Sequence, residues 1–124
     1  MNEWEEKRLQ LISNYFLTIK PFEEEKFRLM LSLSDEYESN IKTEKDDYYK
    51  QAASLSYSEY REKIGDICDT YYAKIQPYRL ALWAKKQVIE DAFNEKTKEI
   101  EATYRKSLNL IFEAEAIDTR MYEL

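Results

Sequence analysis

The sequence of 124 residues contains no histidine, one cysteine, one glycine, two prolines and one valine. Tight turns depend on glycine and proline, and strands favour valine, so this composition leaves room for few turns and little sheet. Glutamate, lysine, leucine, isoleucine, alanine and tyrosine dominate the rest, and most of these lose little side-chain freedom in a helix. We therefore expect an all-α protein that forms a single domain over residues 1–124.

The missing histidine also excludes several kinds of active site. It removes the Ser-His and Cys-His nucleophile pairs, most zinc sites and the di-iron site of four-helix bundles. One glycine cannot supply a glycine-rich phosphate loop. The lone Cys68 lies between Asp66 and Asp69, which disfavour a thiolate, so we interpret it as a small buried hydrophobic residue. We expect no enzymatic activity, no cofactor and no metal site.

Charge and hydropathy indicate which partners and which cellular location to expect for the chain. The net charge of −6, from 25 acidic and 19 basic residues, argues against general affinity for nucleic acid or for anionic membranes. The apolar runs are too short for a membrane span. The N-terminus, "MNEWEEKR", is acidic where a signal peptide is basic, and a single cysteine fits a reducing compartment. We expect a cytoplasmic location.

Apolar and aromatic residues recur every three or four positions in two long segments, which predicts two long helical faces. The first face consists of Trp4, Arg8, Leu11, Ile12, Tyr15, Ile19, Phe22, Lys26, Leu29, Met30, Leu33, Tyr37, Ile41, Glu44 and Tyr48. The second consists of Tyr60, Ile64, Ile67, Tyr71, Ile75, Tyr78, Leu82, Lys85, Ile89, Phe93, Lys96, Ile100, Tyr104, Leu108 and Ile111.

The periodicity lapses at residues 51–56, where we predict that the chain reverses. Ser56 with Glu59 has the spacing of a capping box at the start of the second segment. Asn2 with Glu5 has the same spacing at the start of the first segment. The C-terminal residues 118–124 are expected to fray.

The stretch "YFLTIKPF", residues 15–22, resembles "YYAKIQPY", residues 71–78, at an offset of 56. At this offset, residues 2–55 and 58–111 share ten identities in 54 positions, about twice the number expected by chance. Aromatic residues also replace one another, as in Phe16/Tyr72 and Phe27/Trp83. We interpret the two halves as an internal duplication. The alternative is coincidence, because 56 is eight heptads and any long amphipathic helix matches itself at that shift.

Pro21 and Pro77 leave two architectures open. A proline inside a helix costs about 3 kcal/mol and bends the axis, whereas a proline at a first helical position is tolerated. Because the apolar face continues through both prolines, we favour kinks, and hence a long antiparallel helical hairpin of two helix-Pro-helix units. The alternative is a compact four-helix bundle with a corner at each proline. A hairpin buries only one face of each helix, so we also expect a homodimer.

Aromatic residues beside basic ones mark a candidate protein interface. Its residues are Tyr48, Tyr49, Arg79, Trp83, Lys85 and Lys86. Exposed aromatic residues are common binding anchors, and lysine stems can lie along them. The preferred function is therefore a non-enzymatic interaction protein, such as an adaptor, a chaperone-like protein or a scaffold component. A weaker alternative is an RNA-binding helical module that uses the last four of these residues.

A run of acidic residues supports a different alternative. It comprises Asp35, Glu36, Glu38, Glu44, Asp46 and Asp47. A row of carboxylates can imitate a phosphate backbone, as in an acidic inhibitor, for example a virus-encoded one, that blocks a host nucleic-acid-binding protein. The simpler interpretation is a solvated helix face, and Asp46 with Lys50 has the favourable i,i+4 order for an ion pair.

Overall fold

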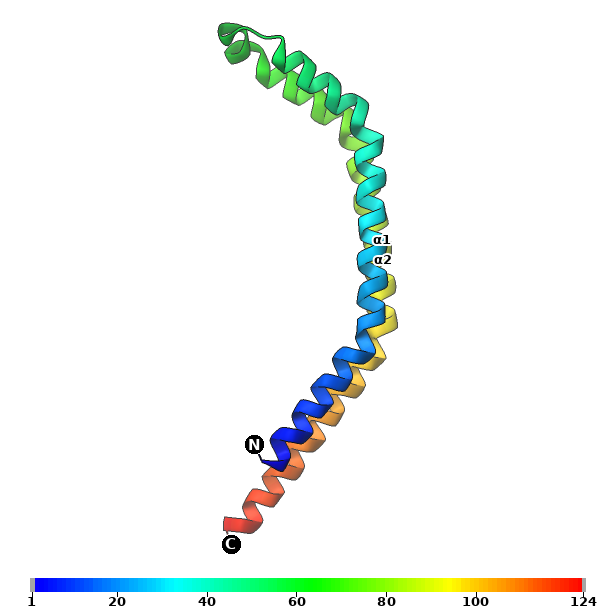
Figure 1. Cartoon of the computed structure of the whole chain (residues 1–124), viewed down its shortest axis with the longest axis vertical. Coiled ribbons are helices and arrows are strands. Elements are labelled where there is room, and N and C mark those ends of the chain that lie inside the picture. Colours follow the sequence, from blue (N-terminus) through cyan, green and yellow to red (C-terminus); the bar gives the residue numbers. More distant parts are fainter. Residues whose placement is uncertain (1, 124) are drawn as a thin grey trace. The chain divides into compact units, whose positions relative to one another are not determined.

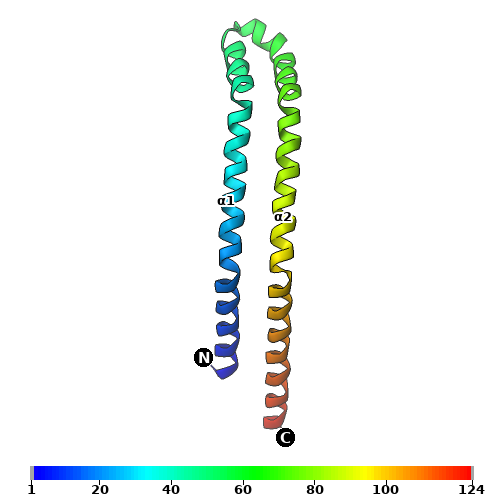
Figure 2. The same cartoon turned by 90° about the vertical axis from the view of Figure 1, so that its right-hand side faces the viewer.

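A computed structural model describes residues 2–123 as two α-helices joined by a short connection (Figure 1). α1 spans Glu3–Ala53, 51 residues, and α2 spans Tyr57–Glu123, 67 residues. The helices pack antiparallel as a hairpin; they overlap in Figure 1 and are seen next to each other in Figure 2. The all-α hairpin is confirmed, and the predicted reversal at residues 51–56 falls between the two helices.

Side chains cap both helices at their first turns, as the spacing predicted. The Asn2 side-chain oxygen accepts a hydrogen bond of 2.8 Å from the backbone N–H of Glu5. The Ser56 hydroxyl accepts one of 3.3 Å from the backbone N–H of Glu59 and donates one of 2.9 Å to the Glu59 carboxylate. The bond from Ser56, together with the charge of Lys63, lowers the pKa of Glu59. Both helix starts are therefore fixed by local contacts.

The two prolines lie inside the helices and form no corners. Pro21 is an internal residue of α1, and Pro77 is an internal residue of α2. Each proline removes one backbone hydrogen bond, but the apolar face packs against the other helix on both sides of it, which offsets that loss. The single chain is therefore a two-helix hairpin, and the four-helix alternative does not apply to it.

The C-terminal tail that we expected to fray is helical over residues 118–123, and residue 124 lies outside the described part. A hydrogen bond of 3.0 Å from the Trp4 indole N–H to Asp118 ties this end of α2 to the start of α1. The Arg8 guanidinium forms an ion pair with Glu115 one turn earlier. These side-chain contacts hold residues that local propensity alone would leave free.

The contacts between the helices fall into two units. Unit 1 combines the residues up to Phe27 with those from Glu90 onward, and unit 2 is Arg28–Ile89. Each unit contains a segment of α1 and a segment of α2. Every predicted face residue of α1 is buried or half-buried. In α2, Tyr60, Tyr78, Lys85 and Lys96 are exposed instead. At two of these sites the next residue along the chain points inward instead: Lys86 is less exposed than Lys85, and Thr97 is less exposed than Lys96.

Very few side chains are fully shielded from water. Among the described residues, the buried ones are Ile19, Ile41, Ile75 and Thr97. The offset of 56 relates Ile19 to Ile75 and Ile41 to Thr97, so each unit holds one residue of each pair. The Thr97 hydroxyl is satisfied within its own helix, because it donates a hydrogen bond of 2.9 Å to the carbonyl oxygen of Phe93.

We predict that Ser56→Ala lowers the free energy of unfolding by about 1 kcal/mol, because the first turn of α2 loses its cap. Chemical denaturation at a fixed protein concentration measures this change. Ser58→Ala, at the second residue of the same helix, is the matched control and should stay within about 0.5 kcal/mol of the unmodified protein. Equal effects of the two substitutions would contradict the capping role of Ser56.

Ile75→Ala should cost about 2–5 kcal/mol, because it removes one of the few buried side chains and leaves a cavity in unit 2. Leu80→Ala, at an exposed position of the same helix, should cost well under 1 kcal/mol. Thermal unfolding of the two variants side by side distinguishes these outcomes. A small effect of Ile75→Ala would show that the seam between the helices is not the source of stability.

Candidate interaction surface

A row of four tyrosines crosses the hairpin in unit 2. The rings of Tyr48 on α1 and Tyr71 on α2 stack at 4.9 Å between centroids. Each continues into its sequence neighbour, Tyr49 at 5.4 Å and Tyr72 at 5.5 Å. Consecutive helical residues point about 100° apart, so the inner pair lies between the helices while the outer pair faces outward. Tyr49 and Tyr72 are both exposed.

The only thiol of the chain, Cys68, lies beside the inner tyrosine pair. The Tyr48 hydroxyl and the Cys68 sulfur share a hydrogen bond of 3.4 Å. This bond, together with burial, raises the pKa of Tyr48 to about 12. Burial also raises the pKa of Tyr71. Cys68 is half-buried, and its contact with Tyr48 is a packing and hydrogen-bonding role.

Unit 1 contains a related but shorter row. Tyr15 on α1 and Tyr104 on α2 stack at 4.4 Å, and Phe16 lies at 5.6 Å from Tyr15. The offset of 56 carries this stack onto the stack in unit 2, since it relates Tyr15 to Tyr71 and Tyr48 to Tyr104. The fourth position is Arg105, which pairs with Glu101 at 2.6 Å. Heptad phase alone explains an inward residue at each position, but it does not explain why all four are tyrosine.

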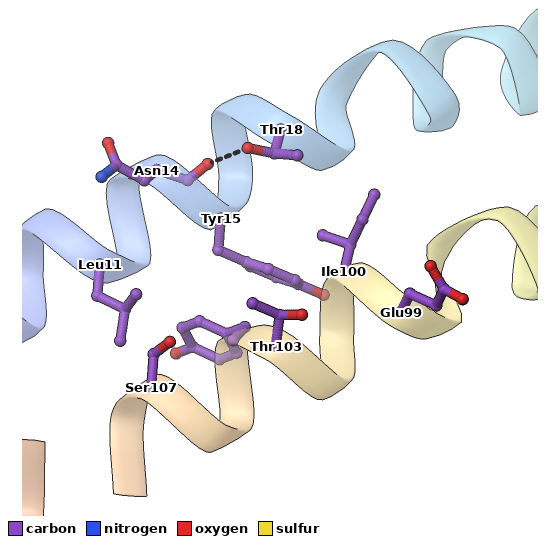
Figure 3. Close-up of a pocket in the computed structure, with 9 residues that line it drawn as sticks. Leu11, Asn14, Tyr15, Thr18, Glu99, Ile100, Thr103 and Ser107 are labelled. Carbon is purple, nitrogen blue, oxygen red and sulfur yellow. Dashed lines mark hydrogen bonds between the residues drawn. The ribbon is translucent and has the colours of Figure 1, made fainter. Parts of the chain in front are cut away.

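A groove of about 390 Å³ lies beside the tyrosine stack of unit 1 (Figure 3). Its lining consists of Leu11, Asn14, Tyr15, Thr18, Glu99, Ile100, Thr103, Tyr104 and Ser107. The Thr18 hydroxyl donates a hydrogen bond of 2.8 Å to the Asn14 carbonyl oxygen (Figure 3). The lining is therefore a mixture of apolar side chains, hydroxyls, one amide and one carboxylate.

The equivalent position in unit 2 is nearly filled, with a cavity of about 10 Å³. Its lining consists of Glu44, Asp47, Tyr48, Gln51, Ile67, Thr70, Tyr71 and Lys74. Thr18 of unit 1 is replaced there by Lys74, and Ser107 is replaced by Gln51. These longer side chains fill the position in unit 2 that is a groove in unit 1. This groove was not predicted from the sequence, although the side-chain sizes at positions related by the offset of 56 indicate it.

The structure separates the six residues of the predicted interface. Tyr48 lies between the helices, whereas Tyr49 and Trp83 are exposed. Arg79 is exposed and Lys86 is half-buried. Lys85 forms an ion pair of 3.0 Å with Glu36 on α1.

The six predicted acidic residues belong to one continuous helix and do not all lie on one side of it. Asp35 and Glu38, three residues apart, share a side, whereas Glu36 is turned about 100° away from Asp35. Glu36 pairs with Lys85, and Glu38 pairs with Lys45 at 3.3 Å, which raises the pKa of Lys45. Glu44 is half-buried, while Asp46 and Asp47 are exposed. This distribution weakens the analogy with a phosphate backbone.

Two further observations concern metal binding and membrane segments. Within residues 2–123, no cluster of three or more histidine, cysteine or acidic side chains could hold a metal ion. In the same range, neither helix includes a segment with the length and hydropathy that a membrane crossing requires. Comparisons of the chain with models of protein families, with curated proteins and with solved structures found no match.

The shifted pKa of Tyr48 leads to a prediction for its titration. Because the folded-state pKa lies above the ordinary value near 10, the associated stability is present below pH 10 and is lost as the pH rises toward 12. The tyrosinate absorbance that Tyr48→Phe removes should therefore have its midpoint near pH 12. Cys68→Ala should lower this midpoint, because the bond to Cys68 is the largest cause of the shift. A midpoint near pH 10 for the missing absorbance would contradict the contact.

Proposed function

We propose that this chain is a non-enzymatic helical protein that self-associates as a homodimer and presents helical faces to other proteins, as an adaptor, chaperone-like protein or scaffold component. The observation that carries the proposal is the amount of apolar surface that the hairpin leaves uncovered. Only three hydrophobic side chains are buried among the described residues. Two helices packed only against each other bury one face each, which leaves much of their apolar surface exposed to water.

The accessible surface supports this reasoning. The chain exposes 9768 Å² for a mass of 15.0 kDa. A compact monomer of this mass exposes about 7,000 Å², so this chain exposes roughly 2,700 Å² more than a compact monomer would. Large hydrophobic side chains contribute to it on both helices. The exposed ones are Leu9, Phe16, Leu17, Phe27, Leu31, Tyr49, Tyr57, Tyr60, Tyr72, Tyr78, Leu80, Trp83, Val88, Leu110, Phe112, Ile117 and Met121.

The charges favour a protein partner over a nucleic acid. Several basic side chains already pair with acidic residues of the other helix: Lys26 with Glu90 at 2.9 Å and Lys96 with Glu25 at 3.7 Å. Lys85, part of the basic cluster considered for RNA, is also paired. An overall charge of −6 adds repulsion from phosphates. The acidic-inhibitor alternative has less support, because its carboxylates do not all share one face of the helix and two of them are already paired with lysines.

Light scattering over a range of protein concentrations tests self-association. At micromolar protein we expect twice the chain mass of 15.0 kDa, and the unfolding midpoint should rise with concentration because association stabilises the folded state. A mass of 15.0 kDa at every concentration, with cooperative and concentration-independent unfolding, would refute self-association.

A further inference from the structure

Two exposed aromatic residues occur at equivalent positions in both halves of the chain. Phe16 and Tyr72 are 59% and 54% exposed, and Phe27 and Trp83 are 68% and 65% exposed. Only ten of 54 positions are identical between the halves, yet these two positions are aromatic and exposed in both. Packing within the hairpin does not require them, because their rings face solvent. Their presence in both halves therefore points to contact outside the chain.

The spacing places each aromatic pair on one side of its helix. The two rings are eleven residues apart, which is about three helical turns. The positions four and seven residues after the first ring lie between them on the same side. We call Phe16, Lys20, Glu23 and Phe27 the α1 stripe, and Tyr72, Gln76, Arg79 and Trp83 the α2 stripe. The α1 stripe belongs to unit 1 and the α2 stripe to unit 2.

The charges of the two stripes are complementary. Glu23 of the α1 stripe corresponds to Arg79 of the α2 stripe, and both are exposed. Neither forms an ion pair with another side chain in the described part of the chain. Lys20 of the α1 stripe is already engaged by Glu24 at 3.8 Å. With two helices running parallel and their aromatic residues aligned, Glu23 of an α1 stripe would face Arg79 of an α2 stripe, whereas it would face a second Glu23 in a pair of α1 stripes.

We propose that the α1 stripe of one copy packs on the α2 stripe of a second copy. Each copy carries both stripes, and two such contacts between the same two molecules would make a closed two-fold dimer. This inference rests on the proposed self-association and adds the surface, the partner and the pairing to it. The uncovered area is sufficient, since obligate homodimer interfaces bury about 2,000–5,000 Å² over both partners.

Tryptophan fluorescence reports on the surface directly. Trp4→Phe leaves Trp83 in the α2 stripe as the single tryptophan, and Trp83→Phe leaves Trp4, whose indole is bonded to Asp118 within unit 1. On raising the protein concentration through the monomer–dimer transition, the emission of Trp83 should shift to shorter wavelength, because its ring leaves water. The emission of Trp4 should stay constant over the same range.

A charge exchange tests the pairing. Arg79→Glu should raise the dimer dissociation constant about tenfold or more, and the double variant Glu23→Arg with Arg79→Glu should recover most of that loss. Arg28→Glu makes the same change of charge at an exposed residue outside both stripes, and it should change the dissociation constant less than about twofold.

The outcomes separate the two proposals. A dimer in which the emission of Trp83 is constant, and in which Arg79→Glu acts no more strongly than Arg28→Glu, would overturn the stripe pairing and leave self-association in place. A dimer weakened by Arg79→Glu but not recovered by the exchange would overturn the Glu23–Arg79 pairing. A chain that is monomeric at all concentrations would overturn both.

Discussion

Pairing along a single seam is the constraint on which the rest of this structure depends. Each helix has one partner, so only one face of it can be withdrawn from water, and the residues beside the seam are at best half-buried. Tyrosine suits this position because its ring packs while its hydroxyl reaches solvent or a neighbouring side chain. The stacks Tyr15–Tyr104 and Tyr48–Tyr71 are the clearest example, with one in each unit.

The seam also contains charged residues, and they act differently from the stacks. Arg8 pairs with Glu115, and Lys26 pairs with Glu90 while lying 4.6 Å above the ring of Phe93. Partly exposed ion pairs contribute little to stability. They do penalise a sliding of one helix along the other, because a shifted register would separate these charges from their partners. The apolar faces thus supply cohesion, and the ion pairs contribute to the register.

The spacing of residues close together in the sequence predicted the two helices and their ends well, but it did not predict the contacts between the helices. The faces, the two caps and the reversal depend on residues within a few positions of each other, so spacing was sufficient to find them. The inward positions of Lys86 and Thr97 were missed by one residue, because the three- and four-residue steps along a helix adjust to the partner. The groove beside Tyr15 was missed because its lining combines residues from opposite ends of the chain, and the signal for it in the sequence is the smaller side chains at the offset of 56.

Contacts as well as residues correspond at the offset of 56. A residue on α1 in one contact corresponds to a residue on α2 in the other, and the reverse. The first half of one repeat packs against the second half of the other, as Tyr15 with Tyr104 and Tyr71 with Tyr48 illustrate. This is the arrangement expected if a single ancestral helix once paired antiparallel with a copy of itself and a tandem gene fusion later joined the copies. Such a fusion would free the two ends from identity, so that one could acquire the small residues Thr18 and Ser107 while the other carried the longer Lys74 and Gln51.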